Sequence, residues 1–136
     1  MTAPVTGLYA GLLVLLLLVL AARVSLLRSK LGVGAGHGND PLLARAIRVH
    51  GNAVEWIPPM LLVLLVAELD GGNRTFLHVC GITFLAARIA HAMGLSRTTK
   101  ASAGRFWGMA GTWLVIVALA VWDIAAILRI GLLRFI

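Results

Sequence analysis

Apolar residues dominate four long stretches of the chain, and polar residues collect in the short segments between them. The apolar stretches cover residues 5–28, 42–69, 75–94 and 104–128. About 20 residues of α-helix cross the roughly 30 Å hydrocarbon layer of a bilayer, so each stretch is long enough to span a membrane. The pattern predicts an all-α, integral membrane four-helix bundle in which residues 1–136 form a single transmembrane domain.

The connections between these stretches are short. Residues 32–41 carry Gly32, Gly34, Gly36 and Gly38 at every second position, which excludes a stable helix there. Residues 70–74 read as a tight turn and residues 96–103 as a polar link. No charged flank precedes the first apolar stretch, and no clear cleavage motif with a polar mature domain follows it. We therefore interpret this stretch as a retained helix rather than a signal peptide.

Composition supports the membrane class. Of the 136 residues, 60% are hydrophobic and 12% are charged, whereas soluble domains carry about 25% charged residues. The formal charge of +7 could indicate nucleic-acid binding, but the basic residues are scattered at predicted helix ends and no recognition motif accompanies them. We expect membrane lipids and no nucleic acid among the partners. We also expect no metal, because the histidines lack the carboxylate or cysteine neighbours of a convincing site.

The basic residues predict an orientation, because cytoplasmic loops carry an excess of Lys and Arg. Nine of them fall near the first and third connections: Arg23, Arg28, Lys30, Arg45, Arg48, Arg88, Arg97, Lys100 and Arg105. Three fall on the opposite side: Arg74, Arg129 and Arg134. This imbalance places both longer loops in the cytoplasm and both termini outside it. A bacterial inner membrane suits the short loops best.

Three polar residues lie inside the second predicted span. Arg48, Asn52 and Glu55 are four and three residues apart, which aligns them along one side of a helix. Polar groups within a membrane are costly and need a functional or structural reason. Because Arg48 and Glu55 are two helical turns apart, about 10 Å, we do not expect one helix to pair them easily. The pattern predicts that a ligand or another chain lies between them.

The other helices bring polar residues to the same layer. Arg88 and His91 lie late in the third span, Arg23 and Arg28 end the first, and Arg105 opens the fourth. Arginines at such positions often do no more than extend to lipid headgroups. Asn52 and Glu55 do not fit that explanation, although Glu55 could simply bridge an arginine of a neighbouring helix.

A small ligand with more negative than positive charge would suit this set of side chains. Guanidinium groups bind carboxylates, Glu55 would bind an ammonium group, and Asn52 would bind an amide. A peptide-like thiol with two carboxylates fits these requirements, but the residues alone do not identify it.

The segment Arg48-Val49-His50-Gly51-Asn52-Ala53-Val54-Glu55-Trp56-Ile57-Pro58 resembles the signature of the MAPEG family, the membrane-associated proteins of eicosanoid and glutathione metabolism. The resemblance extends over nearly the whole chain and is greatest to short bacterial members. It implies a homotrimer of four-helix subunits, with glutathione bound as co-substrate between subunits near the cytoplasmic face.

The resemblance also implies roles for individual residues. Glutathione would be bound by Arg48, Asn52, Glu55, Arg88 and His91, with Arg23 or Arg28 reaching one of its carboxylates. Arg105 matches an arginine that stabilises the glutathione thiolate, which makes it the expected catalytic residue. Eicosanoid-producing members commonly carry a tyrosine one turn beyond His91, where this chain has Leu95. We therefore expect a glutathione transferase acting on a lipophilic second substrate, with glutathione peroxidase activity on lipid hydroperoxides as a further expectation, rather than a leukotriene or prostaglandin synthase.

Two alternatives stay open. The protein could be a non-catalytic member that binds a lipid or glutathione, in which case Arg105→Ala would have no turnover to abolish. It could also be a small oligomeric channel or transporter that uses Arg48 and Glu55 in an ion path. Flux through liposomes without dependence on glutathione would favour the channel.

Overall fold

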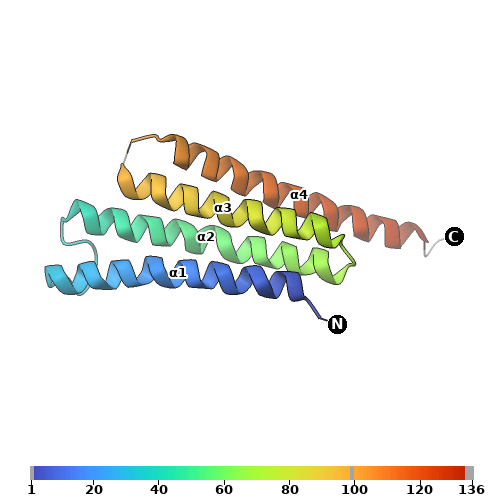
Figure 1. The fold of residues 1–136 in the computed structure, drawn as a ribbon, viewed down its shortest axis with the longest axis horizontal. Helices are drawn as coiled ribbons and strands as arrows, with labels where there is room; N and C mark the ends of the chain where they lie inside the picture. Colours follow the sequence, from blue (N-terminus) through green and yellow to red (C-terminus); the bar gives the residue numbers. More distant parts are fainter. Residues whose placement is uncertain (1, 99, 134–136) are drawn as a thin grey trace.

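Four long helices make up the fold, and the described residues, 2–98 and 100–133 of a computed structural model, contain no strand. The helices are α1 (Pro4–Leu31), α2 (Pro41–Leu69), α3 (Arg74–Arg97) and α4 (Ala103–Leu133). Helices α1, α3 and α4 extend a few residues beyond the stretches expected from the apolar pattern, and α2 begins one residue earlier than expected. Successive helices run in opposite directions (Figure 1). The prediction of an all-α four-helix membrane bundle is confirmed, whereas the homotrimer stays a prediction.

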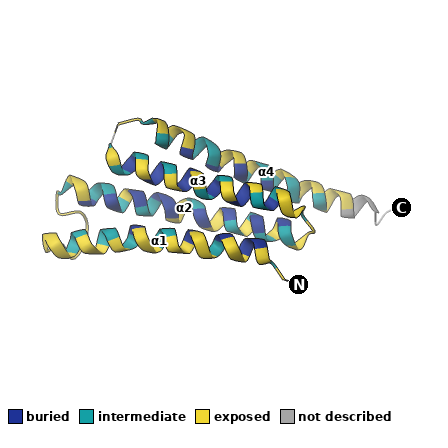
Figure 2. Ribbon diagram, in the orientation of Figure 1, coloured by how far each residue is buried: buried dark blue, intermediate teal, exposed yellow. Residues whose placement is uncertain are grey.

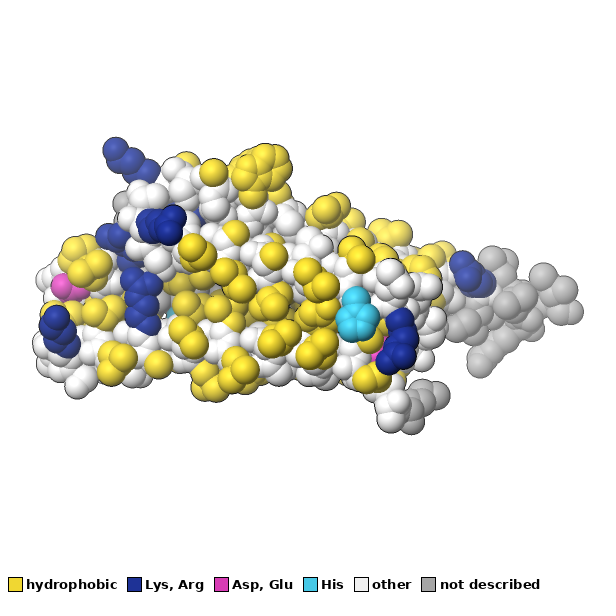
Figure 3. Space-filling model, in the orientation of Figure 1, with side chains coloured by type: hydrophobic (Ala, Val, Ile, Leu, Met, Phe, Trp, Pro, Cys, Tyr) yellow, Lys and Arg dark blue, Asp and Glu magenta, His cyan; other side chains and the backbone are white. Residues whose placement is uncertain are grey.

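The two ends of the bundle differ. The α1–α2 loop and the α3–α4 connection lie together at one end, and the α2–α3 turn lies at the other with the N-terminus (Figure 1). Figure 3 shows Lys and Arg side chains gathered at the first end, which we call the arginine-rich end, and fewer at the second, the turn end. Arg134, one of three basic residues expected at the turn end, lies outside the described residues. Which end faces the cytoplasm stays a prediction.

Local sequence explains where the helices begin and end. Proline, which lacks the N–H that a first helical position leaves unused, stands first in α1 and α2. The side chain of Asp40 accepts a hydrogen bond from the N–H of Leu43, and Asn73 caps α3 in the same way. Gly32 ends α1 with a φ of 65°, a left-handed conformation that glycine adopts without strain.

Glu68, near the end of α2, holds the beginning of α1. Ala3, before α1, provides no side-chain cap. The Glu68 carboxylate instead accepts hydrogen bonds from the N–H groups of Val5 and Thr6, at 2.9 and 2.7 Å. A carboxylate at a helix N-terminus satisfies free donors and opposes the helix dipole. This contact fixes the register between α1 and α2 at the turn end.

The central helices α2 and α3 each touch all the others, whereas α1 and α4 make no contact with each other within the described residues. The core between them contains fully buried Leu13, Met60, Phe84 and Leu119. Exposed residues cover the outside of the bundle (Figure 2), and many are large and apolar. All four helices are long and apolar enough to cross a membrane. An apolar exterior of this extent is expected for a surface in contact with lipid.

Candidate functional site

Helix α2 places the three polar residues on one side, as the spacing predicted, but at different depths. Asn52 is buried, with 5% of its surface exposed, while the side chains of Arg48 and Glu55 are 62% and 50% exposed. Arg48 Nη1 donates to Glu55 Oε1 at 2.9 Å, and Asn52 Nδ2 donates to Glu55 Oε2 at 3.4 Å. The two oxygens of Glu55 are therefore each bound by one neighbour on the same helix.

The ion pair corrects one expectation from sequence. We expected that a single helix could not easily join Arg48 to Glu55, because their backbones are two turns apart. The two long side chains close this gap by extending toward each other along the helix surface. Neither a ligand nor a second chain is needed to neutralise Glu55 in the single chain.

Arg88 of α3 extends the network into the bundle interior. This residue is 2% exposed, and its guanidinium donates from Nη1 to Asn52 Oδ1 at 2.9 Å and from Nη2 to Gly108 O at 3.1 Å. The ring of Phe84 lies 5.8 Å from the guanidinium carbon, within range of a cation–π contact. We call the connected residues Arg48, Glu55, Asn52 and Arg88 the polar chain. Through Gly108 it links α2 and α3 to α4.

Gly108 makes this link possible because it has no side chain. A Cβ at this position would lie 2.6 Å from Ala87 O and 2.7 Å from His91 Cβ. Helix α4 therefore approaches α3 closely enough for the Gly108 carbonyl to meet Arg88. His91, predicted at the site, is buried beside this contact.

Sequence reasoning missed two features of α4. The Gly108 carbonyl accepts from Arg88, and it also accepts from the Thr112 hydroxyl at 2.8 Å. Thr112 is completely buried. The four-residue spacing from Gly108 to Thr112 permits such a bond in any helix, so the sequence held only a weak signal. The bond from Arg88 to the Gly108 carbonyl left no signal in the sequence, because every residue carries a backbone carbonyl.

The remaining predicted arginines lie at the arginine-rich end but contact loops and helix ends. Arg23 Nη1 donates to Ser96 Oγ at 2.7 Å, and Arg28 Nη1 donates to Gly34 O at 3.2 Å. Arg105 Nη1 donates to Lys100 O at 2.9 Å. The hydrogen bonds of Arg23 and Arg28 do not join them to the polar chain within the described residues. The structure thus brings Arg48, Asn52, Glu55 and Arg88 together, with His91 adjacent.

An apolar groove lies beside Arg23. It has a volume of about 610 Å³, and Leu26, Leu27 and Leu42 form part of its wall, with Lys30 at its border. A second cavity of about 320 Å³ lies between α1 and α3, also in contact with Arg23. These hollows place apolar surface next to cationic side chains at the same end of the bundle as the polar chain.

Comparison with known sequences identifies the family. The sequence model of the MAPEG family matches residues 6–125, which include every residue of the polar chain. The chain belongs to the MAPEG family. It is 38% identical over 113 residues to the inner membrane protein YecN of Escherichia coli K12, covering 83% of this chain and 85% of that protein. The protein of the same name from Escherichia coli O6:H1 shows the same identity and coverage. This MAPEG protein is thus an integral membrane member of the family.

Proposed function

We propose that this MAPEG protein is a membrane-bound glutathione transferase with glutathione peroxidase activity on lipophilic hydroperoxides. The observation that carries the proposal is the polar chain, in which a buried network orients a carboxylate and a guanidinium at the surface of α2. A buried charge network that serves packing alone has no need to end in two half-exposed ionic groups. Family membership supplies the class of ligand.

On this proposal, glutathione binds to Arg48 and Glu55, the exposed residues of the polar chain. A carboxylate of the ligand accepts two hydrogen bonds from the Arg48 guanidinium, and the ammonium group of the ligand donates to Glu55. These contacts replace part of the Arg48–Glu55 ion pair. The side-chain oxygen of Asn52 accepts from Arg88, and one of its two N–H groups donates to Glu55. The other N–H is left for the ligand. Its main role on this proposal is to hold Glu55 in position.

Activation of the thiol falls to Arg105, at the beginning of α4. A guanidinium within about 4 Å of a thiol favours the thiolate, the form that attacks an electrophile and displaces its leaving group. Lowering a thiol pKa by two units corresponds to about 2.7 kcal/mol, which one partly desolvated charge pair can supply. The apolar groove beside Arg23 gives a lipophilic substrate a place to enter from the lipid.

A second copy of the chain completes the site on this proposal. Arg48 and Glu55 form an open ledge in the isolated subunit rather than a closed cavity. Homotrimer formation would cover the ledge and place arginines of a neighbouring subunit over the ligand. We also propose that the protein resides in a bacterial inner membrane, with the arginine-rich end in the cytoplasm and both termini outside it.

Calorimetric titration of the detergent-purified protein with glutathione tests the site. We expect Glu55→Gln and Asn52→Ala to weaken binding about tenfold or more, because each removes a charge-assisted contact or its support. Arg74→Gln, which removes an exposed cation at the turn end, is the control and should bind normally. Equal affinity in all four proteins would overturn the assignment.

Turnover with an aromatic electrophile and with cumene hydroperoxide tests catalysis separately. Arg105→Ala should bind glutathione nearly as well as the wild type but lose about 10²-fold in kcat, the effect of removing one group that stabilises a developing or reactive anion. Wild-type binding without turnover of either substrate would instead support the non-catalytic alternative.

A further inference from the structure

A separate cavity with charged walls lies at the turn end, at the opposite end of the bundle from the polar chain. It encloses about 330 Å³ between the α2–α3 turn and the last turns of α4. Its walls include Asp70 and Asn73 from the turn and Trp122 and Arg129 from α4. Two small residues of α4, Ala125 and Ala126, also line the cavity. None of these residues takes part in the proposed glutathione site.

Opposite charges face this cavity without being paired to each other. Asp70 and Arg129 are both exposed, and within the described residues neither side chain takes part in a hydrogen bond or ion pair. The ion pair that the described residues do form is Arg48–Glu55, at the other end. A ligand that carries both an anion and a cation could therefore bind both walls at once.

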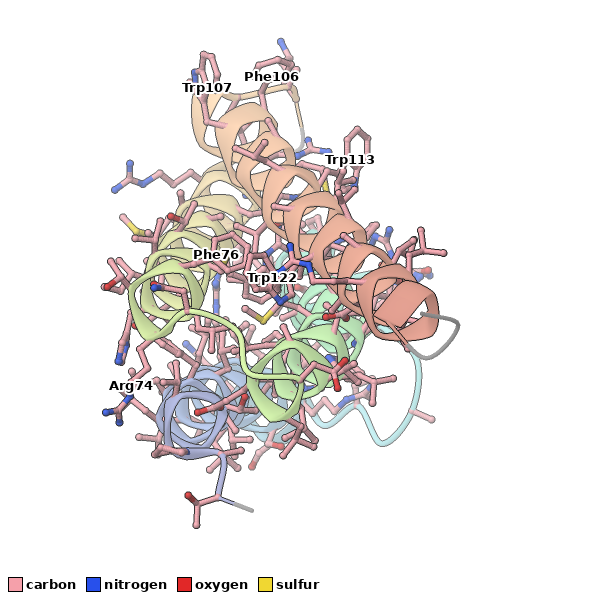
Figure 4. The ribbon with its side chains drawn as sticks, turned by 90° about the vertical axis from the view of Figure 1, so that its right-hand side faces the viewer. Arg74, Phe76, Phe106, Trp107, Trp113 and Trp122 are labelled. Carbon is pink, nitrogen blue, oxygen red and sulfur yellow. The ribbon has the colours of Figure 1, made fainter. Side chains whose placement is uncertain are left out.

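Neutral donors add to these charges. Asn73 uses its side-chain oxygen to cap α3, accepting from the N–H groups of Thr75 and Phe76, which leaves its NH₂ group available. The indole N–H of Trp122 is buried and has no acceptor within the described residues. Figure 4, which views the molecule from this end, shows Trp122 and Phe76 side by side between the helices, and their ring centroids are 5.2 Å apart. Arg129, Asn73 and Trp122 thus supply donors to the walls of the cavity beside the Asp70 carboxylate, so the walls offer partners to an anionic group as well as to a cation.

The cavity also lies where the apolar surface of the bundle meets a polar turn. Helix α2 ends at Leu69, just before Asp70, while Val121, Ile124 and Leu128 on α4 are about 60% exposed. A surface of this kind lies at the boundary between hydrocarbon and headgroups. A lipid with its acyl chains along α4 would bring its headgroup to the cavity.

We propose that this cavity binds the headgroup of a zwitterionic, amine-bearing phospholipid of the phosphatidylethanolamine type. The phosphate binds Arg129 and the Asn73 amide, and the primary ammonium donates hydrogen bonds to Asp70. A choline headgroup has no N–H to donate, and an anionic headgroup without an amine would leave Asp70 unpaired. The site therefore selects for the amine.

Native mass spectrometry of the detergent-purified protein tests this proposal. The protein is incubated with equal amounts of phosphatidylethanolamine, phosphatidylcholine and phosphatidylglycerol with identical acyl chains, and the retained lipid is measured. We expect the wild type to prefer the ethanolamine lipid about tenfold over each of the others, the effect of one additional charge-assisted contact. Equal retention of the three lipids by the wild type would overturn the proposal without any variant.

Variants locate the preference. Asp70→Asn and Arg129→Gln should each abolish it, whereas Arg74→Gln should keep it, because Arg74 lies on the outside of the same end (Figure 4). Both cavity residues are exposed and unpaired within the described part of the chain, so their replacement should leave the thermal midpoint unchanged. A preference that persists in both variants would refute the site. Displacement of the lipid by equimolar soluble phosphoethanolamine would refute a lipid as the occupant.

Discussion

Replacing Asn52 and Arg88, singly and together, tests whether the polar chain depends on its buried members. Asn52→Leu removes the acceptor of Arg88 Nη1, leaving the guanidinium with the Gly108 carbonyl and the face of Phe84. Arg88 Nε already lacks a partner within the described residues. An unsatisfied neutral group costs about 1–3 kcal/mol and a charged one costs more, so we expect a loss of roughly 3 kcal/mol or more in unfolding free energy.

Arg88→Met should cost less, although it removes the larger side chain. The substitution leaves Asn52 Oδ1 without its donor, a neutral group worth about 1–3 kcal/mol. It also removes the penalty of burying a guanidinium, which offsets part of that loss. In the double variant neither the charge nor the amide remains. We expect the double variant to be more stable than Asn52→Leu alone, with a coupling energy of about 1–3 kcal/mol.

Denaturant titration of the detergent-purified variants, followed by far-UV circular dichroism, measures these free energies. Lys30→Met is the control, because it removes an exposed cation from the same end of the bundle and should change stability by less than about 0.5 kcal/mol. The reasoning fails if Arg88→Met is as costly as Asn52→Leu, or if adding it to Asn52→Leu restores no stability.

Three further predictions concern contacts that hold the helices together, each measured as a change in unfolding free energy by the same titration. Glu68→Ala should cost about 0.5–2 kcal/mol, the usual cost of losing an N-terminal cap, because the N–H groups of Val5 and Thr6 lose their acceptor. Gly108→Ala should cost about 1–3 kcal/mol through overpacking against Ala87 O, whereas the open position Gly51→Ala should be neutral or stabilising. Gly81→Ala should cost at least as much as Gly108→Ala, because the new Cβ meets the ring of Tyr9 and disturbs the bond from the Tyr9 hydroxyl to His78, while Gly11→Ala, with nothing nearby, serves as its control. A control that destabilises as much as its test variant would contradict the steric explanation.

The sequence predicted the parts of this structure that depend on local pattern. Continuous apolar stretches located the four helices, and the spacing of Arg48, Asn52 and Glu55 placed them on one side of α2. The placement of Arg88 at the same depth followed from counting residues along two antiparallel spans. Such inferences succeed because helical periodicity and membrane thickness are fixed lengths.

Side-chain partners were harder to predict because they depend on tertiary distances. The Arg48–Glu55 pair forms within one helix because two flexible side chains extend toward each other, and residue spacing does not report that freedom. The partner of Arg23 is Ser96, 73 residues away on α3. The contact of Arg88 with Gly108 depends on how closely α4 approaches α3, which no single side chain determines.

Hydrogen bonds in the polar chain run in one direction, from Arg88 to Asn52 and from Asn52 to Glu55, and this direction explains why an amide lies between the two charged groups. Arg88 donates only, and Glu55 as a carboxylate accepts only, so a residue between them must accept on one side and donate on the other. Aspartate at position 52 would accept from Arg88 but repel Glu55, and a lysine there would repel Arg88. Asparagine meets both conditions without adding a charge to the interior. The buried guanidinium thereby orients the exposed carboxylate through a neutral link, and the net charge of the ledge is set by Arg48 and Glu55 alone.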